Sequence, residues 1–224
     1  MGYVFHFDVF RTYFIPFLAA AGLTLKLGGI CIAYATVVGV ILGVLLTSGN
    51  KFIKGLVKVY VEAFRLTPFL VQLLFFYFGF SLFFGFRISS SAAGTLTLCL
   101  NGAAYAAETF RGGFQSVPKM QMLAGYSLGF TKIQTYRRII VPQGIRIILP
   151  AYISLVIEIL KDTSFFSIIG VTEATGFMRY AASMTYRNFE LFTILGLFYL
   201  ICTTIIGQIG RILEKRLKGY EINY

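Results

Sequence analysis

Long stretches without a charged residue dominate this sequence and constrain its fold more than any other feature. Four such stretches, each of 20 to 24 residues, cover residues 27–50, 66–86, 88–107 and 191–210. A fifth apolar stretch, residues 147–169, differs because it contains three charged side chains, those of Glu158, Lys161 and Asp162. Since about 20 apolar residues cross a bilayer as one helix, the chain is predicted to be an all-α membrane protein with five transmembrane helices.

The positions of the basic residues predict which ends of the spans face the cytoplasm. Lysine and arginine outnumber aspartate and glutamate by 20 to 9, and most of them fall within residues 51–65, 111–146 and 211–218. Because positive residues mark the cytoplasmic side of membrane helices, the amino terminus is predicted outside and the carboxyl terminus in the cytoplasm. The basic residues are not interleaved with aromatic ones as nucleic-acid binding requires, so the expected partner of this charge is the lipid bilayer and no nucleic acid is expected.

This pattern divides the chain into a membrane domain and two short ends. Residues 1–16 are expected to form a lead-in at the outer surface, residues 17–215 the membrane domain, and residues 216–224 a cytoplasmic tail. The five predicted spans cover about residues 17–48, 60–85, 88–110, 144–169 and 190–212. In the first span, the stretch GVILG (39–43) has the small-residue spacing that lets two helix backbones approach closely. The sequence leaves open whether this contact lies within one subunit or between two.

The basic segment 116–142, between the third and fourth spans, has no stretch long enough to cross a bilayer. Its capping and helix-ending residues predict a first helix of about ten residues and then a second one: Ser116, Pro118 and Gly129 for the first, Thr131 and Pro142 for the second. On the cytoplasmic side, two such helices form a platform at the membrane surface. The residues alone leave open whether this platform binds a partner or only anchors the segment to lipid.

Polar side chains interrupt the second and third spans. Pro68 is predicted either to kink the second span or to start its helix afresh, and the amide of Gln72 follows one turn later. Such an amide either hydrogen-bonds across helices or lines a cavity, and the sequence does not separate the two. In the third span, Asn101, Tyr105 and Glu108 follow one another at spacings of four and three residues, so they lie on one polar face.

Two pairs of opposite charges lie three residues apart near the cytoplasmic ends of these spans. Glu62 is positioned to pair with Arg65, and Glu108 with Arg111, because residues three apart share one face of a helix. The second pair is interpreted as a helix-end ion pair that braces the cytoplasmic segment.

Charges inside the fourth span predict a functional site there, because a charged residue within a bilayer is costly and typically faces water or a partner charge. The predicted substrate pathway comprises Ser154, Glu158, Lys161, Asp162 and Thr163 in this span, with Gln72, Asn101 and Tyr105 as further candidates. The alternative is a local ion pair between Glu158 and Lys161 that only braces the helix bundle.

The segment around Gly129 resembles the cytoplasmic signature of the permeases of binding-protein-dependent ABC importers. That signature runs E-A-A, three residues, G, nine residues, I-x-L-P, and the residues at matching positions here are Ala124, Gly129, Ile139 and Pro142. Leu123 stands in place of the glutamate and Gly125 in place of the second alanine.

Three further stretches resemble one branch of that family, the polar amino-acid uptake permeases. They are EAFRLTPFLVQLLFFYFG (62–79), LNGAAYAAETFRGGFQSVP (100–118) and LKDTSFFSIIGVTE (160–173). The resemblance, which covers about residues 20–215, implies one half of a type I importer in the bacterial cytoplasmic membrane. It implies as partners a second permease subunit, identical or related, two copies of an ATPase subunit, and an extracytoplasmic amino-acid-binding protein.

The resemblance also places the contact with the ATPase in a short coupling helix before Gly129. The coupling residues that it implies are Met120, Leu123, Ala124, Gly125, Leu128 and Gly129. Because Leu123 replaces a glutamate, the docking of the ATPase is expected to depend more on apolar contact than on a charged pair.

Motifs for chemistry on the chain itself are missing from the sequence. It has no G-x-x-x-x-G-K-[ST] phosphate loop, so ATP is expected on the partner and no cofactor on this chain. Neither a catalytic nor a metal site is expected, and Cys31, Cys99 and Cys202 are interpreted as packing residues. The predicted function is therefore that of a membrane permease subunit, not an enzyme, in an ATP-driven amino-acid importer working by alternating access. A stand-alone secondary transporter or channel is the alternative, and the residues do not identify the amino acid.

Overall fold

The computed structural model describes residues 5–85 and 88–218, and the regular structure in these ranges is entirely helical. The long helices are α1 (Val9–Leu46), α2 (Lys51–Arg65), α5 (Ser90–Gln115), α8 (Val141–Asp162) and α10 (Asn188–Lys218). The shorter elements are α3 (Phe69–Leu74), the π-helical turn η1 (Phe75–Gly79), α4 (Phe80–Phe84), α6 (Lys119–Ser127), α7 (Lys132–Thr135), the π-helical turn η2 (Tyr136–Ile140), the 3-10 helix η3 (Thr163–Ile169) and α9 (Ala174–Thr185). The prediction of an all-α protein is confirmed.

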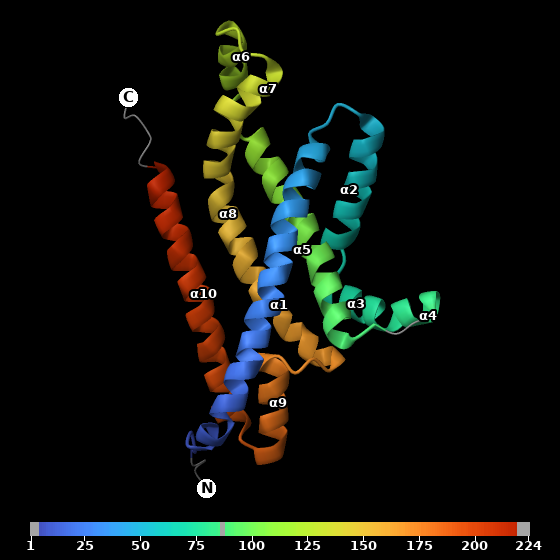
Figure 1. Ribbon diagram of the computed structural model, residues 1–224, viewed down its shortest axis with the longest axis vertical. Coiled ribbons are helices and arrows are strands. Elements are labelled where there is room, and N and C mark those ends of the chain that lie inside the picture. Colours follow the sequence, from blue (N-terminus) through green and yellow to red (C-terminus); the bar gives the residue numbers. More distant parts are fainter. Residues whose placement is uncertain (1–4, 86–87, 219–224) are drawn as a thin grey trace.

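Helix α5 forms the centre of the bundle. It packs against α1, α2 and α8, while α10 lies along α8 on the outside (Figure 1). The α6–α7 hairpin projects at one end of the bundle, and α9 lies at the opposite end. Most buried residues of α5 are alanine or glycine, and such small side chains let neighbouring helices approach closely.

The GVILG stretch makes one of these close approaches within the subunit. A β carbon added to Gly39 would lie 2.4 Å from the β carbon of Ala106, and one added to Gly43 would lie 2.9 Å from the Ala107 carbonyl oxygen. Both glycines are buried between α1 and α5. Of the two contacts that the sequence left open, the one inside a single subunit is confirmed.

The predicted second span is broken and does not run as one helix over residues 60–85. Helix α2 ends at Arg65, and the chain turns by 101° before α3. Pro68 has an extended backbone (φ −62°, ψ 134°) directly before α3. Because proline has no amide hydrogen and disfavours a helical conformation in the preceding residue, Pro68 starts a new helix, one of the two outcomes predicted for it.

Three helical stretches of the described chain are long and apolar enough to cross a membrane: Val9–Leu46, Lys132–Ile169 and Asn188–Leu217. The bent pair formed by α2 and α3 becomes a fourth if it is taken as one span. Helix α5 is not among them although its 26 residues reach about 39 Å, because its glycine and polar residues lower its hydropathy. The count of five spans therefore stays a prediction.

The first helix begins earlier than predicted. Helix α1 starts at Val9, not near residue 17, and Pro16 lies inside it. Its first turns pack against a hydrophobic cluster shared with α9 and α10, which stabilises the helix despite the proline. Residues 1–4 of the predicted lead-in and 219–224 of the predicted tail lie outside the described residues.

The segment between α5 and α8 departs from the prediction at two residues. Ser116 does not cap α6 but closes α5, where its hydroxyl donates to the Gly112 carbonyl oxygen. Gly129 follows α6 in the left-handed conformation (φ 77°) and Thr131 caps α7, both as predicted. The second helix does not end at Pro142 but continues through η2 into α8, because the wide π-helical turn before the proline accommodates its missing hydrogen bond.

Candidate functional site

A cavity of about 450 Å³ lies where the break between α2 and α3 meets α5 and α8. The break contributes residues 65–70 to its wall. The polar residues on the other walls are Asn101 and Tyr105 of α5 and Glu158 and Asp162 of α8. The tertiary structure thus brings together four of the residues that the sequence proposed for a substrate pathway, from two helices far apart in the chain.

The amides of Gln72 and Asn101, both buried, hold the break in place. Gln72 Nε2 donates to the carbonyl oxygens of Phe64 (2.7 Å) and Thr67 (3.0 Å). Asn101 Nδ2 donates to Gln72 Oε1 (3.0 Å) and to the Phe64 carbonyl oxygen (3.2 Å). These bonds satisfy carbonyl groups that the end of α2 leaves without a helical partner. Gln72 therefore hydrogen-bonds between helices, one of its two predicted roles, while Asn101 also lines the cavity.

Three other predicted pathway residues lie outside this cavity. The Ser154 hydroxyl donates to the Pro150 carbonyl oxygen (3.2 Å), and the buried Thr163 hydroxyl donates to the Leu160 carbonyl oxygen (2.7 Å). Both hydroxyls thus satisfy the backbone of their own helix. Lys161 is exposed and is not part of the cavity wall.

Glu158 and Asp162 lie one helical turn apart on the cavity wall. Among the residues that the structure describes, no ion pair joins Glu158 to Lys161, so the local bracing pair is not formed. Two carboxylates on one wall give the cavity a negative side that suits a cationic group.

Arg65 lies at the rim of the cavity and joins α2 to α5. Its Nη1 lies 3.9 Å from Glu108 Oε1, and its guanidinium carbon lies 5.5 Å from the centre of the Tyr105 ring. Arg111 donates to both carboxylate oxygens of Glu108, as predicted. The predicted pairing of Glu62 with Arg65 is wrong, since Glu62 pairs with a lysine one turn earlier (3.5 Å). The true partner of Arg65 is distant in sequence, so residue spacing gives no signal for it.

The α6–α7 hairpin closes around Gly125. This residue is buried, and a β carbon there would lie 2.6 Å from Thr135 Cγ2, which explains a glycine at a position where the resembled signature has alanine. The exposed members of the predicted coupling set are Met120, Leu123, Ala124, Leu128 and Gly129. The three large side chains among them are each more than half exposed, so α6 presents an apolar outer surface.

One continuous helical stretch, Lys132–Ile169, runs from this hairpin along the bundle (Figure 1), and two of its residues line the cavity. It begins at the Thr131 cap and carries Glu158 and Asp162 near its far end. The hairpin and the two carboxylates of the cavity therefore lie on the same helical stretch of the chain.

Residues 35–219 match the family described as the binding-protein-dependent transport system inner membrane component. The chain belongs to this family. The permease is 38% identical over 214 residues to the octopine transport system permease protein OccM of Rhizobium meliloti, with 91% of this chain and 86% of the relative covered. It is 34% identical over 206 residues to the glutamine transport system permease protein GlnP of Escherichia coli (strain K12), with 91% and 94% covered.

Solved structures agree with this membership. The permease superposes on a chain from the crystal structure of an amino acid ABC transporter with histidines, with a TM-score of 0.89 and 34% identity, covering 96% of this chain and 100% of that one. An inward-facing MetNI methionine ABC transporter matches with a TM-score of 0.72 at 20% identity over 87% of this chain and 92% of that one, which shows the fold alone. The predicted family, the permeases of binding-protein-dependent transport systems, is confirmed.

Proposed function

We propose that this permease forms the translocation pathway of an ATP-driven importer for a polar amino acid. A binding protein outside the membrane delivers the amino acid, and a separate ATPase, in two copies, drives alternating access. The permease pairs with a second permease subunit in a bacterial cytoplasmic membrane. It crosses the membrane five times, α5 and the bent α2–α3 pair included, with its amino terminus outside and its carboxyl terminus in the cytoplasm.

The cavity at the α2–α3 break is the observation that carries this proposal. An amino acid at neutral pH has one ammonium and one carboxylate group. Glu158 and Asp162 offer carboxylates for the ammonium, and Arg65 at the rim offers a guanidinium for the carboxylate. Asn101 and Tyr105 add hydrogen-bonding groups. The volume of about 450 Å³ falls within the range of small-molecule sites.

The path from the hairpin to the cavity supports coupling to a partner ATPase. The apolar surface of α6 lies at the end of the bundle opposite α9, which is the cytoplasmic end in the proposed orientation. An ATPase bound there would move the helical stretch Lys132–Ile169 and with it the carboxylates of the cavity. This gives alternating access a mechanical route through the subunit.

Reconstitution into liposomes separates this function from that of a stand-alone secondary transporter or channel. The full chain is inserted together with its partner ATPase and binding protein, and uptake of a panel of labelled amino acids is measured with and without ATP. We expect uptake that requires both ATP and the ATPase. Uptake by this chain alone, driven by an ion gradient, would contradict the proposal.

A further inference from the structure

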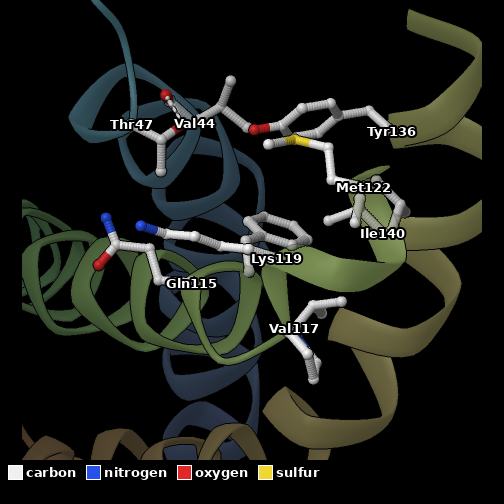
Figure 2. A pocket seen from close by; sticks show the side chains of 11 residues that line it. Val44, Thr47, Gln115, Val117, Lys119, Met122, Tyr136 and Ile140 are labelled. Carbon is white, nitrogen blue, oxygen red and sulfur yellow. Dashed lines mark hydrogen bonds between the residues drawn. The ribbon is translucent and has the colours of Figure 1, made fainter. Parts of the chain in front are cut away.

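Two adjoining cavities lie between the carboxyl end of α1 and the α6–α7 hairpin, and Figure 2 shows the first of them. The first, of about 500 Å³, is bounded by Val44 and Thr47, by the start of α6 and by Tyr136 in η2. The second, of about 580 Å³, is also lined by Val44, Thr47 and Tyr136, and it extends to Lys132 and Arg137. Neither shares a lining residue with the cavity at the α2–α3 break, so they form a separate site.

The charged groups that line this site are all basic. Lys119 lines the first cavity, where its side chain extends toward those of Thr47 and Gln115 in Figure 2, and Lys132 and Arg137 line the second. Over residues 5–85 and 88–218, no aspartate or glutamate lines either cavity. The Tyr136 hydroxyl points across the site and is a further hydrogen-bond donor. This arrangement favours an anionic group with several oxygen acceptors.

An apolar stripe on α1 leads into the same site. Val37, Ile41 and Val44 are 62%, 54% and 52% exposed and follow one another at spacings of four and three residues. They therefore share one face of α1, along about 10 Å of the helix, and Val44 lines both cavities. An apolar chain can lie along this stripe while an anionic group at its end reaches the cations.

We propose that these cavities bind an anionic phospholipid of the surrounding bilayer. Its phosphate lies among Lys119, Lys132 and Arg137, and one acyl chain lies along the stripe that ends at Val44. Basic pockets at the ends of membrane helices attract anionic headgroups in this way. A segment of the ATPase would match the cations but not the stripe, because the stripe runs away from the hairpin along a helix long and apolar enough to span the membrane.

A lipid in this site would join two parts of the subunit that the proposed transport cycle moves relative to each other. Val44 belongs to α1, which packs tightly on α5, whereas Tyr136 and Arg137 belong to the helical stretch that leads to the amino-acid cavity. Bound lipid would stabilise one relative position of these parts. The proposal does not depend on which amino acid is carried.

The test uses the full chain, with and without its ATPase partner, purified in detergent. The charge variant is Lys132→Gln with Arg137→Gln, and Val44→Trp fills the apolar part without changing charge. The matched control is Lys215→Gln with Arg216→Gln, two exposed cations on α10 that line neither cavity. Native mass spectrometry counts lipid retained from phosphatidylglycerol or phosphatidylcholine, with inorganic phosphate as a competitor. Thermal unfolding in phosphatidylcholine checks that each variant is folded.

We expect the wild-type chain to retain phosphatidylglycerol in preference to phosphatidylcholine. The charge variant should bind phosphatidylglycerol roughly tenfold to thirtyfold more weakly, Val44→Trp should also bind it more weakly, and the control should match the wild type. Equal retention by the wild type, the charge variant and Val44→Trp would overturn the proposal. If an equal concentration of inorganic phosphate displaced the phosphatidylglycerol, the site would be one for free anions and the proposal would be overturned. Loss of the lipid whenever the ATPase is bound would also overturn it.

Discussion

Gly39 of α1 lies so close to Ala106 of α5 that a β carbon on the glycine would come within 2.4 Å of the β carbon of the alanine. Gly39→Ala should therefore push α1 away from α5. We expect the free energy of unfolding to fall by about 1–3 kcal/mol, the usual cost of overpacking a core. Thermal unfolding in detergent measures this change.

Gly29 provides a control on the same helix. A β carbon at this position would have nothing within 4 Å, and the residue is exposed. Gly29→Ala should leave the free energy of unfolding unchanged or raise it by up to about 1 kcal/mol, because alanine favours a helix more than glycine does. Equal destabilisation by both substitutions would mean that the contact with Ala106 is not the cause.

We expect the two carboxylates of the cavity at the α2–α3 break to determine substrate affinity. We expect Glu158→Gln and Asp162→Asn each to raise the KM for ATP-driven uptake about tenfold, because each removes a charge-assisted hydrogen bond worth roughly 1.5 kcal/mol. Uptake assays in liposomes measure the change. Glu62→Gln, at a half-exposed site on α2, is the matched control and should leave the KM unchanged. Wild-type KM values for both cavity variants would exclude these carboxylates from substrate binding.

Gly125 should be essential for the shape of the α6–α7 hairpin. Gly125→Ala places a methyl group against Thr135, so we expect less uptake per ATP hydrolysed in the reconstituted complex. Thr135→Ser removes the methyl group that the new side chain would meet first and leaves Oγ1 at 2.9 Å, so the double variant should recover part of the coupling. Gly112→Ala, where an added β carbon has nothing within 4 Å, should have no effect. Failure of the double variant to recover would point to a cause other than this contact.

Leu123 tests whether the ATPase docks through apolar contact. The side chain is 52% exposed on α6, so a substitution there changes the surface more than the fold. We expect Leu123→Glu to lower ATP-driven uptake severalfold without lowering the unfolding temperature, while Gln121→Glu, on another face of the same helix, has a smaller effect. If Leu123→Glu improves coupling, docking depends on a charged pair, and the prediction that the ATPase docks through apolar contact is wrong.

Glu173 is fully buried where α1, α9 and α10 meet. Burial raises the pKa of its carboxyl above the ordinary value, and the hydrogen bonds it accepts do not cancel this effect. These bonds come from the backbone N–H groups of Thr175 (3.0 Å) and Gly176 (2.9 Å) and from the hydroxyls of Thr24 (3.1 Å) and Tyr199 (3.4 Å). The carboxyl therefore holds its proton more tightly in the folded protein than in the unfolded chain.

This shift predicts the direction of a pH effect on stability. The contribution of the protonated Glu173 is complete below its unfolded pKa of about 4.3 and is lost as the pH rises through its higher folded pKa. We expect the unfolding temperature to fall over that interval and Glu173→Gln, which cannot titrate, to flatten the profile. Thermal unfolding as a function of pH measures both. A Glu173→Gln profile as steep as that of the wild type would assign the effect to another group.

The sequence by itself determined the features that depend on neighbouring residues. The apolar stretches predicted an all-helical membrane protein, and the glycine and threonine signals placed the hairpin turn at Gly129 and Thr131. The pairing of Glu108 with Arg111 followed from their spacing. Each of these features is decided by hydropathy, backbone conformation or contacts within one or two helical turns. The sequence alone is therefore enough to predict them.

Only the tertiary structure decided which helices face one another. The 101° turn before α3 brings residues 65–70 to Asn101, Glu158 and Asp162, and it gives Arg65 a partner on α5 in place of Glu62. Crossing angles and close approaches depend on how small side chains on two helices fit together, which no single stretch of sequence encodes. The composition therefore revealed what kind of protein this is, whereas packing around α5 decided which of its polar residues share a cavity.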